Sequence, residues 1–383
     1  MSVLIDNTHT FDFWDYQSRR VVRSPVVGIP YVIVNGKIGI SGNSILVYKG
    51  DSSNPTSFSL VNELLPGVDE DYWNVSSAID STGTIHIVYY DSETDQVRYT
   101  KFNTLTDLFV GGVEQLQESL INIEMPVCIS IDSNDIPHVV FIATTATETG
   151  DYYPYYTNRI GGSWKSNVLV STITTSSKTP DLAIDKDNLP CVAWGRGHVE
   201  VDRFAVGNTN NATSFTIVKE VTTTTNWSTP TIVIDSLGNH WFSTYPVFMT
   251  LYKHNYGAAW GSWTEFVSGY DSQEQVTSAA DGTNIYLFYS SFGTGCNTYL
   301  INTGGSFGFE FSLSNGCSDV AIPIVKWGYW VDFDSSGLNK KDGGRIELDY
   351  VWGDDNYAFP TIIYFGGSKV AVKNKVRMII EQH

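Results

Sequence analysis

Five aspartates recur about fifty residues apart in similar surroundings. Each follows a short apolar stretch and precedes a polar turn, as in SSAIDSTGTIHIVYY (76–90) and TIVIDSLGNHWFSTY (231–245). The five are Asp80, Asp132, Asp185, Asp235 and Asp281. A ring of carboxylates could bind cations, but Asp in this position also accepts hydrogen bonds from the backbone amides that follow it. We therefore expect each aspartate to stabilise its own turn.

A second column of polar side chains follows the aspartates five or six residues later. Its members are His86, His138, Cys191, His240 and Tyr286. Imidazole and thiolate together suit a soft divalent metal. Equivalent positions of a repeat are spread around the molecule, however, and a tyrosine in the column fits packing with a polar tip. We expect a packing role, with no metal and no cofactor.

Aromatic clusters are the candidate sugar contacts. Tyr152, Tyr153 and Tyr155 lie in TETGDYYPYY, and Trp227 lies in TTTTNWSTP. Exposed rings of this kind stack on pyranose faces, and an acidic neighbour can bind hydroxyl groups. The alternative is that Tyr155 or Tyr156 is a buried aromatic of a strand. The sequence leaves both interpretations open.

The repeat itself predicts the fold. Each unit of about fifty residues holds four short apolar segments separated by turn residues, without a sustained helical period. The third segment ends in an aromatic residue and the fourth begins with another, as in NRIGGSWKS (158–166). Units of this kind predict an all-β fold, a single β-propeller of four-stranded blades. Seven blades are favoured; the alternative is six plus a C-terminal β-region from about residue 318.

The ends of the chain follow the repeat poorly. We expect residues 1–22 to form an N-terminal arm, in which SVLID (2–6) could close the ring by pairing into the last blade. Residues 23–383 would form the propeller, with a divergent last blade at 318–383. Closure would remove an exposed strand edge.

Composition excludes several classes of function. The formal charge of −18 repels phosphate backbones, so we expect no nucleic-acid partner. No apolar run reaches membrane-spanning length, and no secretory signal is present, so we expect no membrane insertion and synthesis in the cytoplasm. The four cysteines, at 128, 191, 296 and 317, lack metal-binding spacing and are expected to be free.

The ID-x-x-G-x-x-H hairpin followed by a GGSW-type strand resembles the BNR/sialidase-like superfamily of propellers. The resemblance covers residues 76–310 and is closest to divergent, non-enzymatic members from bacteriophage virions and bacterial surfaces. The repeats depart from the sialidase Asp box, S-x-D-x-G-x-T-W, because none continues into Thr-Trp. The R-I-P segment of the sialidase arginine triad has only Arg23-Ser24-Pro25 as a counterpart. Candidate triad partners are Arg98, Arg159, Arg196 and Arg203.

The resemblance implies a non-enzymatic structural or adhesion propeller of a virus particle, such as a bacteriophage tail, fibre or decoration component. Its partners would be other virion subunits and host surface glycans, and its location the virion. Two alternatives stay open: a lectin-like carbohydrate-binding propeller, and a sialidase-like glycan hydrolase. Fold alone does not decide among them.

Overall fold

The described part of the chain, in this computed structural model, consists of β-strands and their connections, without a helix. It comprises residues 2–6, 10–11, 20–37, 43–53, 55–66, 72–116, 120–145, 152–173, 180–195, 201–223, 230–244, 250–267, 276–281, 284–290, 297–303, 306–307, 311–312, 331–333, 350–354 and 361–365. No helix of these residues is long and apolar enough to cross a bilayer.

The strands form seven antiparallel sheets, numbered here in chain order. Sheet 1 contains β2 (Thr10–Phe11), β3 (Val21–Arg23), β4 (Pro30–Lys37), β5 (Ser44–Gly50) and β6 (Phe58–Leu64). Sheet 2 contains β7 (Tyr72–Ile79), β8 (Thr84–Asp91), β9 (Gln96–Asn103) and β10 (Leu108–Gln115). Sheet 3 contains β11 (Leu120–Ile131), β12 (Pro137–Thr145), β13 (Tyr153–Asn158) and β14 (Val168–Leu169).

Sheets 4 to 7 continue the same order. Sheet 4 contains β15 (Asp181–Ile184), β16 (Pro190–Trp194), β17 (Val201–Gly207) and β18 (Phe215–Thr222). Sheet 5 contains β19 (Thr231–Ile234), β20 (His240–Thr244), β21 (Thr250–His254) and β22 (Trp263–Val267). Sheet 6 contains β23 (Val276–Asp281), β24 (Asn284–Ser290), β25 (Asn297–Thr303), β26 (Ser306–Phe307) and β27 (Phe311–Ser312). Sheet 7 contains β1 (Ser2–Asp6), β28 (Val331–Phe333), β29 (Tyr350–Asp354) and β30 (Thr361–Phe365).

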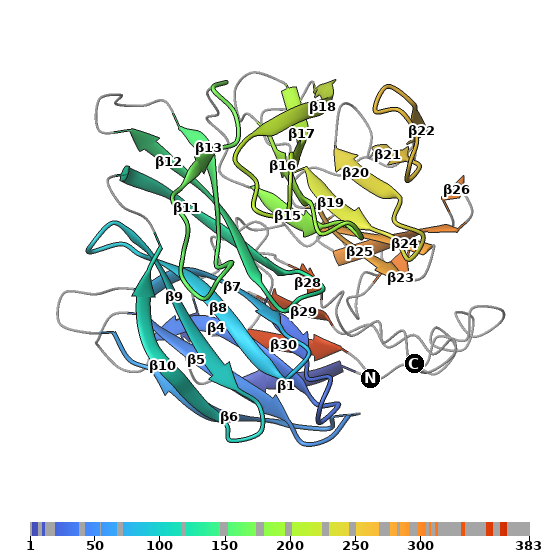
Figure 1. The fold of residues 1–383 in the computed structure, drawn as a ribbon. Helices are drawn as coiled ribbons and strands as arrows, with labels where there is room; N and C mark the ends of the chain where they lie inside the picture. Colours follow the sequence, from blue (N-terminus) through green and yellow to red (C-terminus); the bar gives the residue numbers. More distant parts are fainter. Residues whose placement is uncertain are drawn as a thin grey trace.

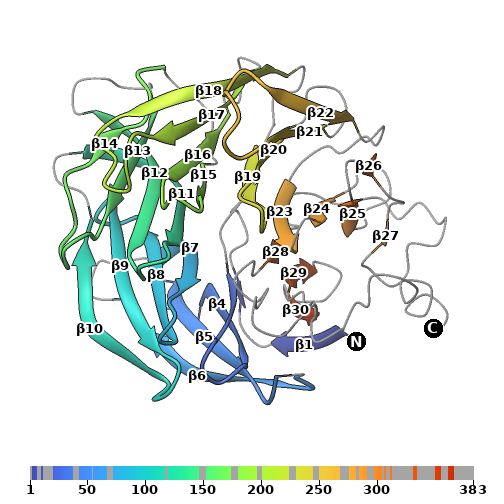
Figure 2. The same ribbon diagram turned by 45° about the vertical axis from the view of Figure 1, so that its right-hand side comes forward.

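The sheets follow one another around a ring (Figures 1 and 2). Contacts run from β4 to β7, then to β11, β15, β19, β23 and β28, and β28 contacts β3 of sheet 1. β1 pairs antiparallel with β30, so the first and last described strands share one sheet. The predicted all-β propeller is confirmed. The number of blades and the division into an arm at 1–22 and a propeller at 23–383 stay predictions, since much of 313–360 lies outside the described residues.

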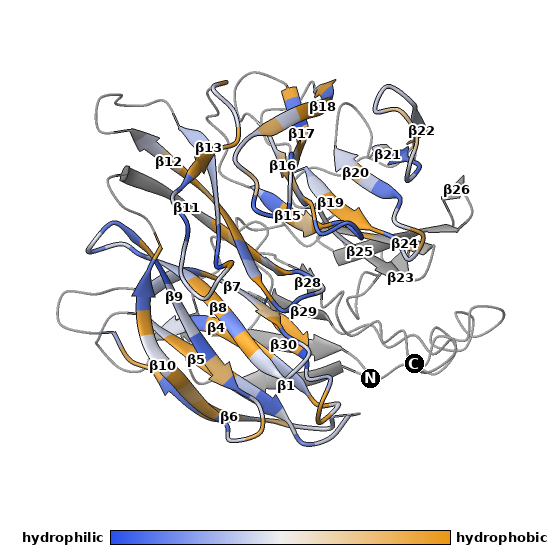
Figure 3. Cartoon of the chain, viewed as in Figure 1, coloured by the Kyte–Doolittle hydropathy of each residue, from blue (hydrophilic) through white to orange (hydrophobic). Residues whose placement is uncertain are grey.

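The hydrophobic core lies between neighbouring sheets. One cluster joins sheets 1 and 2, and others join sheets 2 and 3, 3 and 4, and 4 and 5. The second strand of a sheet is buried along nearly its whole length, as in β16 and β20, whereas the fourth strand β10 is largely accessible. β10, with the sequence LFVGGVEQ, carries both hydrophobic and hydrophilic stretches along its length (Figure 3). Burial between the sheets therefore stabilises the ring.

The turn after each aspartate has one backbone geometry in sheets 2 to 5. The amide of the third residue after the aspartate donates to the aspartate carbonyl, at 2.9–3.2 Å. That third residue has φ between +62° and +84°, and it is Gly83, Asp135, Asn188 or Gly238. Glycine adopts this conformation without strain, and Asn and Asp tolerate it better than other residues do. The shared turn places the side chains of the repeat at equivalent points around the ring.

Candidate functional site

In sheet 2, the predicted turn aspartate belongs to a buried chain of three polar side chains. Asp80 Oδ1 accepts hydrogen bonds from the amides of Thr82 and Thr84, at 3.0 and 2.7 Å. Asp80 Oδ2 lies 3.2 Å from His86 Nε2. The other ring nitrogen of His86, Nδ1, lies 2.7 Å from the hydroxyl oxygen of Tyr99. The aspartate thus fixes both the turn and the imidazole.

Sheet 3 repeats this arrangement. Asp132 Oδ1 accepts from the amides of Asn134 and Ile136, each at 2.8 Å. His138 Nε2 lies 3.5 Å from Asp132 Oδ2, and His138 Nδ1 lies 2.5 Å from the Tyr156 hydroxyl. Because the same chain of groups occurs in two sheets, its basic role is to hold neighbouring strands together.

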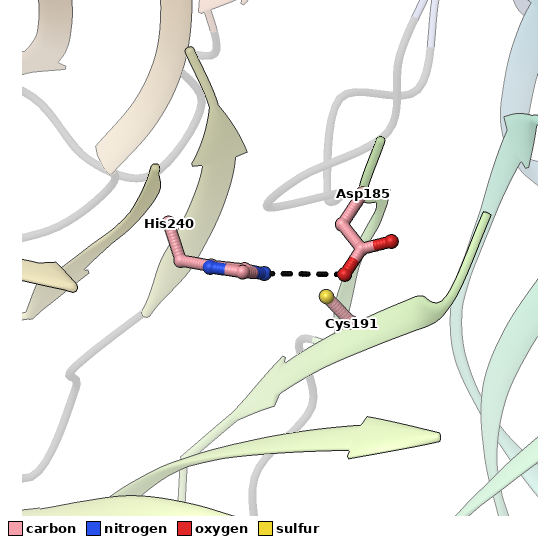
Figure 4. Close-up of side chains that lie close together, drawn as sticks. All are labelled: Asp185, Cys191 and His240. Carbon is pink, nitrogen blue, oxygen red and sulfur yellow. Dashed lines mark ion pairs between the residues drawn. The ribbon is translucent and has the colours of Figure 1, made fainter. Parts of the chain in front are cut away.

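Sheets 4 and 5 depart from the pattern. Sheet 4 has Cys191 where the earlier sheets have histidine, and the shorter side chain does not reach an imidazole's position beside Asp185. His240 of sheet 5 approaches instead, with Nε2 3.4 Å from Asp185 Oδ2 (Figure 4). The aspartate of sheet 5, Asp235, is bound by its own neighbours, because Trp241 Nε1 donates to it at 2.9 Å.

Sheet 6 holds the last two members of the two columns. Asp281 ends β23 and Tyr286 lies in β24, but their side chains lie outside the described residues.

Burial and hydrogen bonding determine which of these linked side chains are ionised. Burial alone would raise the pKa of Asp80, but hydrogen bonds from His86, Thr84 and Thr82 lower it to about 2. The ionised carboxylate only accepts hydrogen bonds, so His86 Nε2 donates to it and, in the neutral ring, Nδ1 accepts from Tyr99. Burial raises the pKa of the Tyr99 hydroxyl above its ordinary value. Tyr99 is therefore a hydrogen-bond donor near neutral pH rather than a base.

Because the pKa of Asp80 is lowered, the free energy of unfolding should change with pH in the acid range. An aspartate has a pKa of about 3.9 in an unfolded chain. Because the folded value is about 2, the contribution of Asp80 to the free energy of unfolding is complete above about pH 4 and is lost as the pH falls towards 2. Urea midpoints measured from pH 6 to pH 2 are expected to fall across that window. Asp80→Asn should flatten the curve there; a curve of unchanged slope would contradict this assignment.

A pocket of about 330 Å³ opens beside the Asp80 chain, between sheets 2 and 3. Sheet 2 supplies His86, Tyr99 and Lys101, and the turns of sheet 3 supply Asp135 and Arg159. Gly161 and Gly162 form part of the wall with φ of +79° and +85°. This volume is at the lower end of the range for small-ligand sites, about 300–1,000 Å³.

Most charged groups of the pocket already have protein partners. Asp135 accepts from the amide and the hydroxyl of Ser81, at 2.8 and 2.5 Å, which also ties the two sheets together. Arg159 makes a two-point ion pair with Glu114, at 2.9 and 3.2 Å. Lys101 is different, because in the described part of the chain no hydrogen bond or ion pair is recorded for its ammonium group. A positive charge is therefore available to a ligand.

The described members of the predicted sugar-contact set, Tyr152, Tyr153 and Tyr155, do not line this pocket. Tyr155 is buried and its ring stacks on Phe141, with centroids 6.0 Å apart, so it offers no face to a sugar. Tyr152 and Tyr153 are partly exposed, and a ligand contact there stays a prediction. Trp227 lies outside the described residues.

The arginines named as triad candidates are not brought together. The Arg23 guanidinium donates to the carbonyls of Gly28 and Ser53, each at 2.8 Å, within sheet 1 and its connections. Arg98 bonds Asp91 within sheet 2, and Arg203 bonds Glu220 within sheet 4. Arg196 lies outside the described residues. Apart from Arg159, which joins sheets 2 and 3 through Glu114, these described arginines bond within their own sheets.

Sequence reasoning did not single out the pocket or Lys101. Its walls come from two successive repeats, and a single-repeat alignment does not show which side chains face each other across sheets. One usable signal was the GG of NRIGGSW, since glycines beside a polar turn permit close approach of a ligand.

Comparison with known proteins supports the fold more than any one activity. No known family profile matches the chain, and neither does any curated protein. Among solved structures, the chain is similar to the Hadza microbial sialidase Hz136, with a TM-score of 0.51 and 10% identity over 72% of this chain. This chain covers 63% of that sialidase.

Two further solved structures are similar over more of their length. A polysaccharide lyase of family PL25, an ulvan lyase, has a TM-score of 0.54 and 9% identity, covering 94% of this chain and 95% of the lyase. A protein of unknown function from Dyadobacter fermentans has a TM-score of 0.52 and 12% identity, covering 81% of this chain and 96% of its own. At these identities the likeness shows the fold alone.

The comparisons correct one prediction. We expected a protein without enzymatic activity, yet the sialidase and the lyase are glycan-processing enzymes. The prediction relied on missing sialidase motifs, and propellers with the same fold can place different residues in their sites. The structural neighbours are carbohydrate-active β-propellers, and this agrees with the carbohydrate-binding alternative.

Proposed function

We propose that the protein is a carbohydrate-active propeller that binds an acidic sugar residue in the pocket between sheets 2 and 3. The observation that carries the proposal is the Lys101 ammonium group, which lines this pocket without a recorded protein partner. The chain has 41 acidic and only 23 basic residues, so a lysine left without a carboxylate in a pocket is unusual here. Its natural complement is a carboxylate or sulfate group.

The rest of the pocket suits the remaining groups of a sugar. The Asp135 carboxylate and the Tyr99 and His86 pair are polar groups that hold hydroxyls, and Arg159 adds a second cation whose partner Glu114 neutralises part of its charge. The Tyr99 ring is buried, so recognition relies on hydrogen bonds rather than on stacking. The volume accommodates a small ligand, such as one or two sugar units of a chain.

The neighbours support an acidic substrate class. The ulvan lyase was solved bound to -[GlcA(1-4)Rha3S]-, a repeat with one uronic acid and one sulfated sugar. The support is by analogy of fold, since none of its residues is matched to this chain. The pocket chemistry points independently to the same kind of ligand.

Replacing Lys101 with glutamine is expected to weaken binding of a uronate-containing oligosaccharide at least tenfold. A hydrogen bond to a charged group contributes about 1.5–3 kcal/mol, and 1.4 kcal/mol corresponds to a factor of ten. Isothermal titration with uronate oligosaccharides and their neutral, carboxyl-reduced counterparts measures the effect. The same samples, assayed for new reducing ends and for unsaturated products, report hydrolysis or elimination.

Lys253→Gln is the matched control, because Lys253 also lies on the third strand of a sheet but contacts the ring of Trp241 rather than this pocket. It should bind like the unchanged protein. Equal affinity for acidic and neutral oligosaccharides, or no effect of Lys101→Gln, would refute the proposed recognition of charge.

The virus-particle setting is a separate proposal that rests on the sequence resemblance alone. It places the protein in a virion, as a tail, fibre or decoration component, with other virion subunits and host surface glycans as partners. Mass spectrometry of purified particles from the source would test it, and absence of the chain from them would exclude it.

A further inference from the structure

Three potential metal ligands from two sheets converge at the junction of sheets 4 and 5. Asp185 and Cys191 belong to the hairpin of β15 and β16, and His240 begins β20. Their ligand atoms lie within 4.8 Å of one another. Figure 4 shows the carboxylate, the sulfur and the imidazole directed towards a common point. Among the described residues, this is the one group of three such side chains at that spacing.

The unusual member of the group is His240. Its side chain is only 3% exposed, yet neither ring nitrogen makes a hydrogen bond to any described residue. Nε2 lies 3.4 Å from Asp185 Oδ2, without hydrogen-bond geometry. Buried polar atoms are normally hydrogen-bonded, so an imidazole left in this way calls for a partner.

The distances fit a bridging ion. In a tetrahedral zinc site with Zn–N and Zn–O bonds of about 2.0–2.1 Å, the nitrogen and the oxygen are about 3.3–3.4 Å apart. In such a triangle each ligand atom directs its lone pair at the ion rather than at the other ligand, so an N···O contact without hydrogen-bond geometry is compatible with a bridging ion. His138 has a similar contact with Asp132, at 3.5 Å, but its other ring nitrogen is bound to Tyr156, whereas both nitrogens of His240 lack a partner among the described residues. With a Zn–S bond of about 2.3 Å, the sulfur of such a site lies about 3.5 Å from each of the other two ligand atoms. Cys191 Sγ lies within 4.8 Å of both.

The equivalent histidines of sheets 2 and 3 show what is specific to this junction. His86 and His138 each have a tyrosine hydroxyl on Nδ1, from Tyr99 and Tyr156. His240 belongs to sheet 5, whose own tyrosine position holds Tyr252, but its ring is directed towards sheet 4. At the tyrosine position of sheet 4 lies Phe204, whose ring packs 6.0 Å from that of His240 and offers no hydroxyl. The substitutions of this repeat therefore remove the partners found elsewhere and supply a thiol.

The surroundings of the cluster suit a closed site. The Trp260 ring packs against His240 with centroids 5.0 Å apart, and His254 stacks on the same tryptophan at 4.2 Å. The exposed fractions of Asp185 and Cys191 are 5% and 0%. A dry shell of this kind strengthens metal–ligand interactions and restricts exchange.

We propose that Asp185, Cys191 and His240 bind a zinc ion that joins sheets 4 and 5, with a water molecule as fourth ligand. Aspartate, thiolate and imidazole are all established zinc ligands, and a thiolate favours zinc over magnesium or calcium. On binding, the Cys191 thiol releases its proton to solvent and the thiolate takes the ion, with no change of oxidation state. The site is separate from the sugar pocket, so the two proposals stand or fall independently.

The test is a metal titration of the chelator-treated full chain with Zn²⁺, and with Co²⁺ as a spectroscopic probe. We expect one high-affinity Zn²⁺ per chain, a higher thermal midpoint with zinc, and a thiolate-to-cobalt charge-transfer band with Co²⁺. Cys191→Ser should abolish the band and weaken Zn²⁺ binding more than tenfold. His240→Gln should weaken it similarly.

Two matched controls separate this site from general effects of substitution. Cys128 is also buried and lies 3.6 Å from a carboxylate oxygen of Asp181, but no described residue supplies a third ligand there, so Cys128→Ser should bind both metals normally. His138→Gln should do the same. Persistence of the cobalt band in Cys191→Ser overturns the proposal. If the variants do not fold, the unmutated protein decides: absence of stoichiometric zinc binding or of the cobalt band also overturns it.

Discussion

Replacing Asp132 with alanine is expected to lower the free energy of unfolding by about 3–5 kcal/mol, because several buried donors lose their acceptor at once. One carboxylate oxygen accepts the amides of Asn134 and Ile136, and the other accepts from Asn210 Nδ2 at 2.9 Å. Although burial raises the pKa of this carboxyl, the adjacent imidazole of His138 and the hydrogen bonds from Ile136 and Asn210 hold the pKa well below the usual range. The variant leaves these donors without an acceptor in a site that excludes water. Urea unfolding followed by tryptophan fluorescence measures the change.

Asp51 is the matched control for this prediction. It accepts hydrogen bonds from Thr56 and Ser57 in an exposed turn, where water can replace it. Asp51→Ala should therefore change the urea midpoint far less than Asp132→Ala does. Equal effects of the two substitutions would show that burial is not what makes the repeated aspartate important.

Trp194→Ala is expected to be similarly damaging, at about 3–5 kcal/mol. Trp194 lies in β16, is fully buried, and belongs to the cluster that joins sheets 3 and 4 with Tyr156 and Leu182. Truncation leaves a cavity between two sheets that are held together mainly by such packing. Thermal and urea unfolding should both report the loss.

Two further substitutions serve as comparisons for Trp194→Ala. Trp194→Phe should cost clearly less, because it keeps an aromatic ring and removes an indole nitrogen that has no hydrogen-bond partner. Leu105→Ala should be close to neutral, since Leu105 is 60% exposed. A Trp194→Ala variant as stable as Leu105→Ala would mean that the junction of sheets 3 and 4 contributes little to the fold.

The turns show how much of the fold was readable from sequence. An Asp followed by a short polar turn and a glycine, as at Asp80 and Gly83, predicts the geometry of that turn, because the hydrogen bonds involved are local. The same turn was recognisable at Asp132 and Asp185, although Asp135 and Asn188 take the place of glycine. The four successive strands of each of sheets 2 to 5 followed from these signals.

Contacts between sheets were not readable in the same way. Ser133 donates to Asn188 Oδ1 of the next sheet at 2.8 Å, and Ser81 bonds Asp135 similarly. His240 leaves its own aspartate and approaches Asp185 because Cys191 is short. Each of these depends on side-chain rotamers and on the rotation between successive sheets. A periodic sequence specifies which positions are equivalent, not which of them meet.

The pairing of β1 with β30 has a consequence for the order of folding. Ser2–Asp6 precedes all the other described strands in the chain, yet its partner Thr361–Phe365 is synthesised only after the other six sheets. Until then sheet 7 cannot form, and the edges on either side of its place in the ring remain open to other chains. Closing a loop that contains nearly the whole chain carries an entropic cost and makes the final contacts strongly non-local. The last step of folding is thus a slow closure, during which the partly formed ring is most exposed to aggregation.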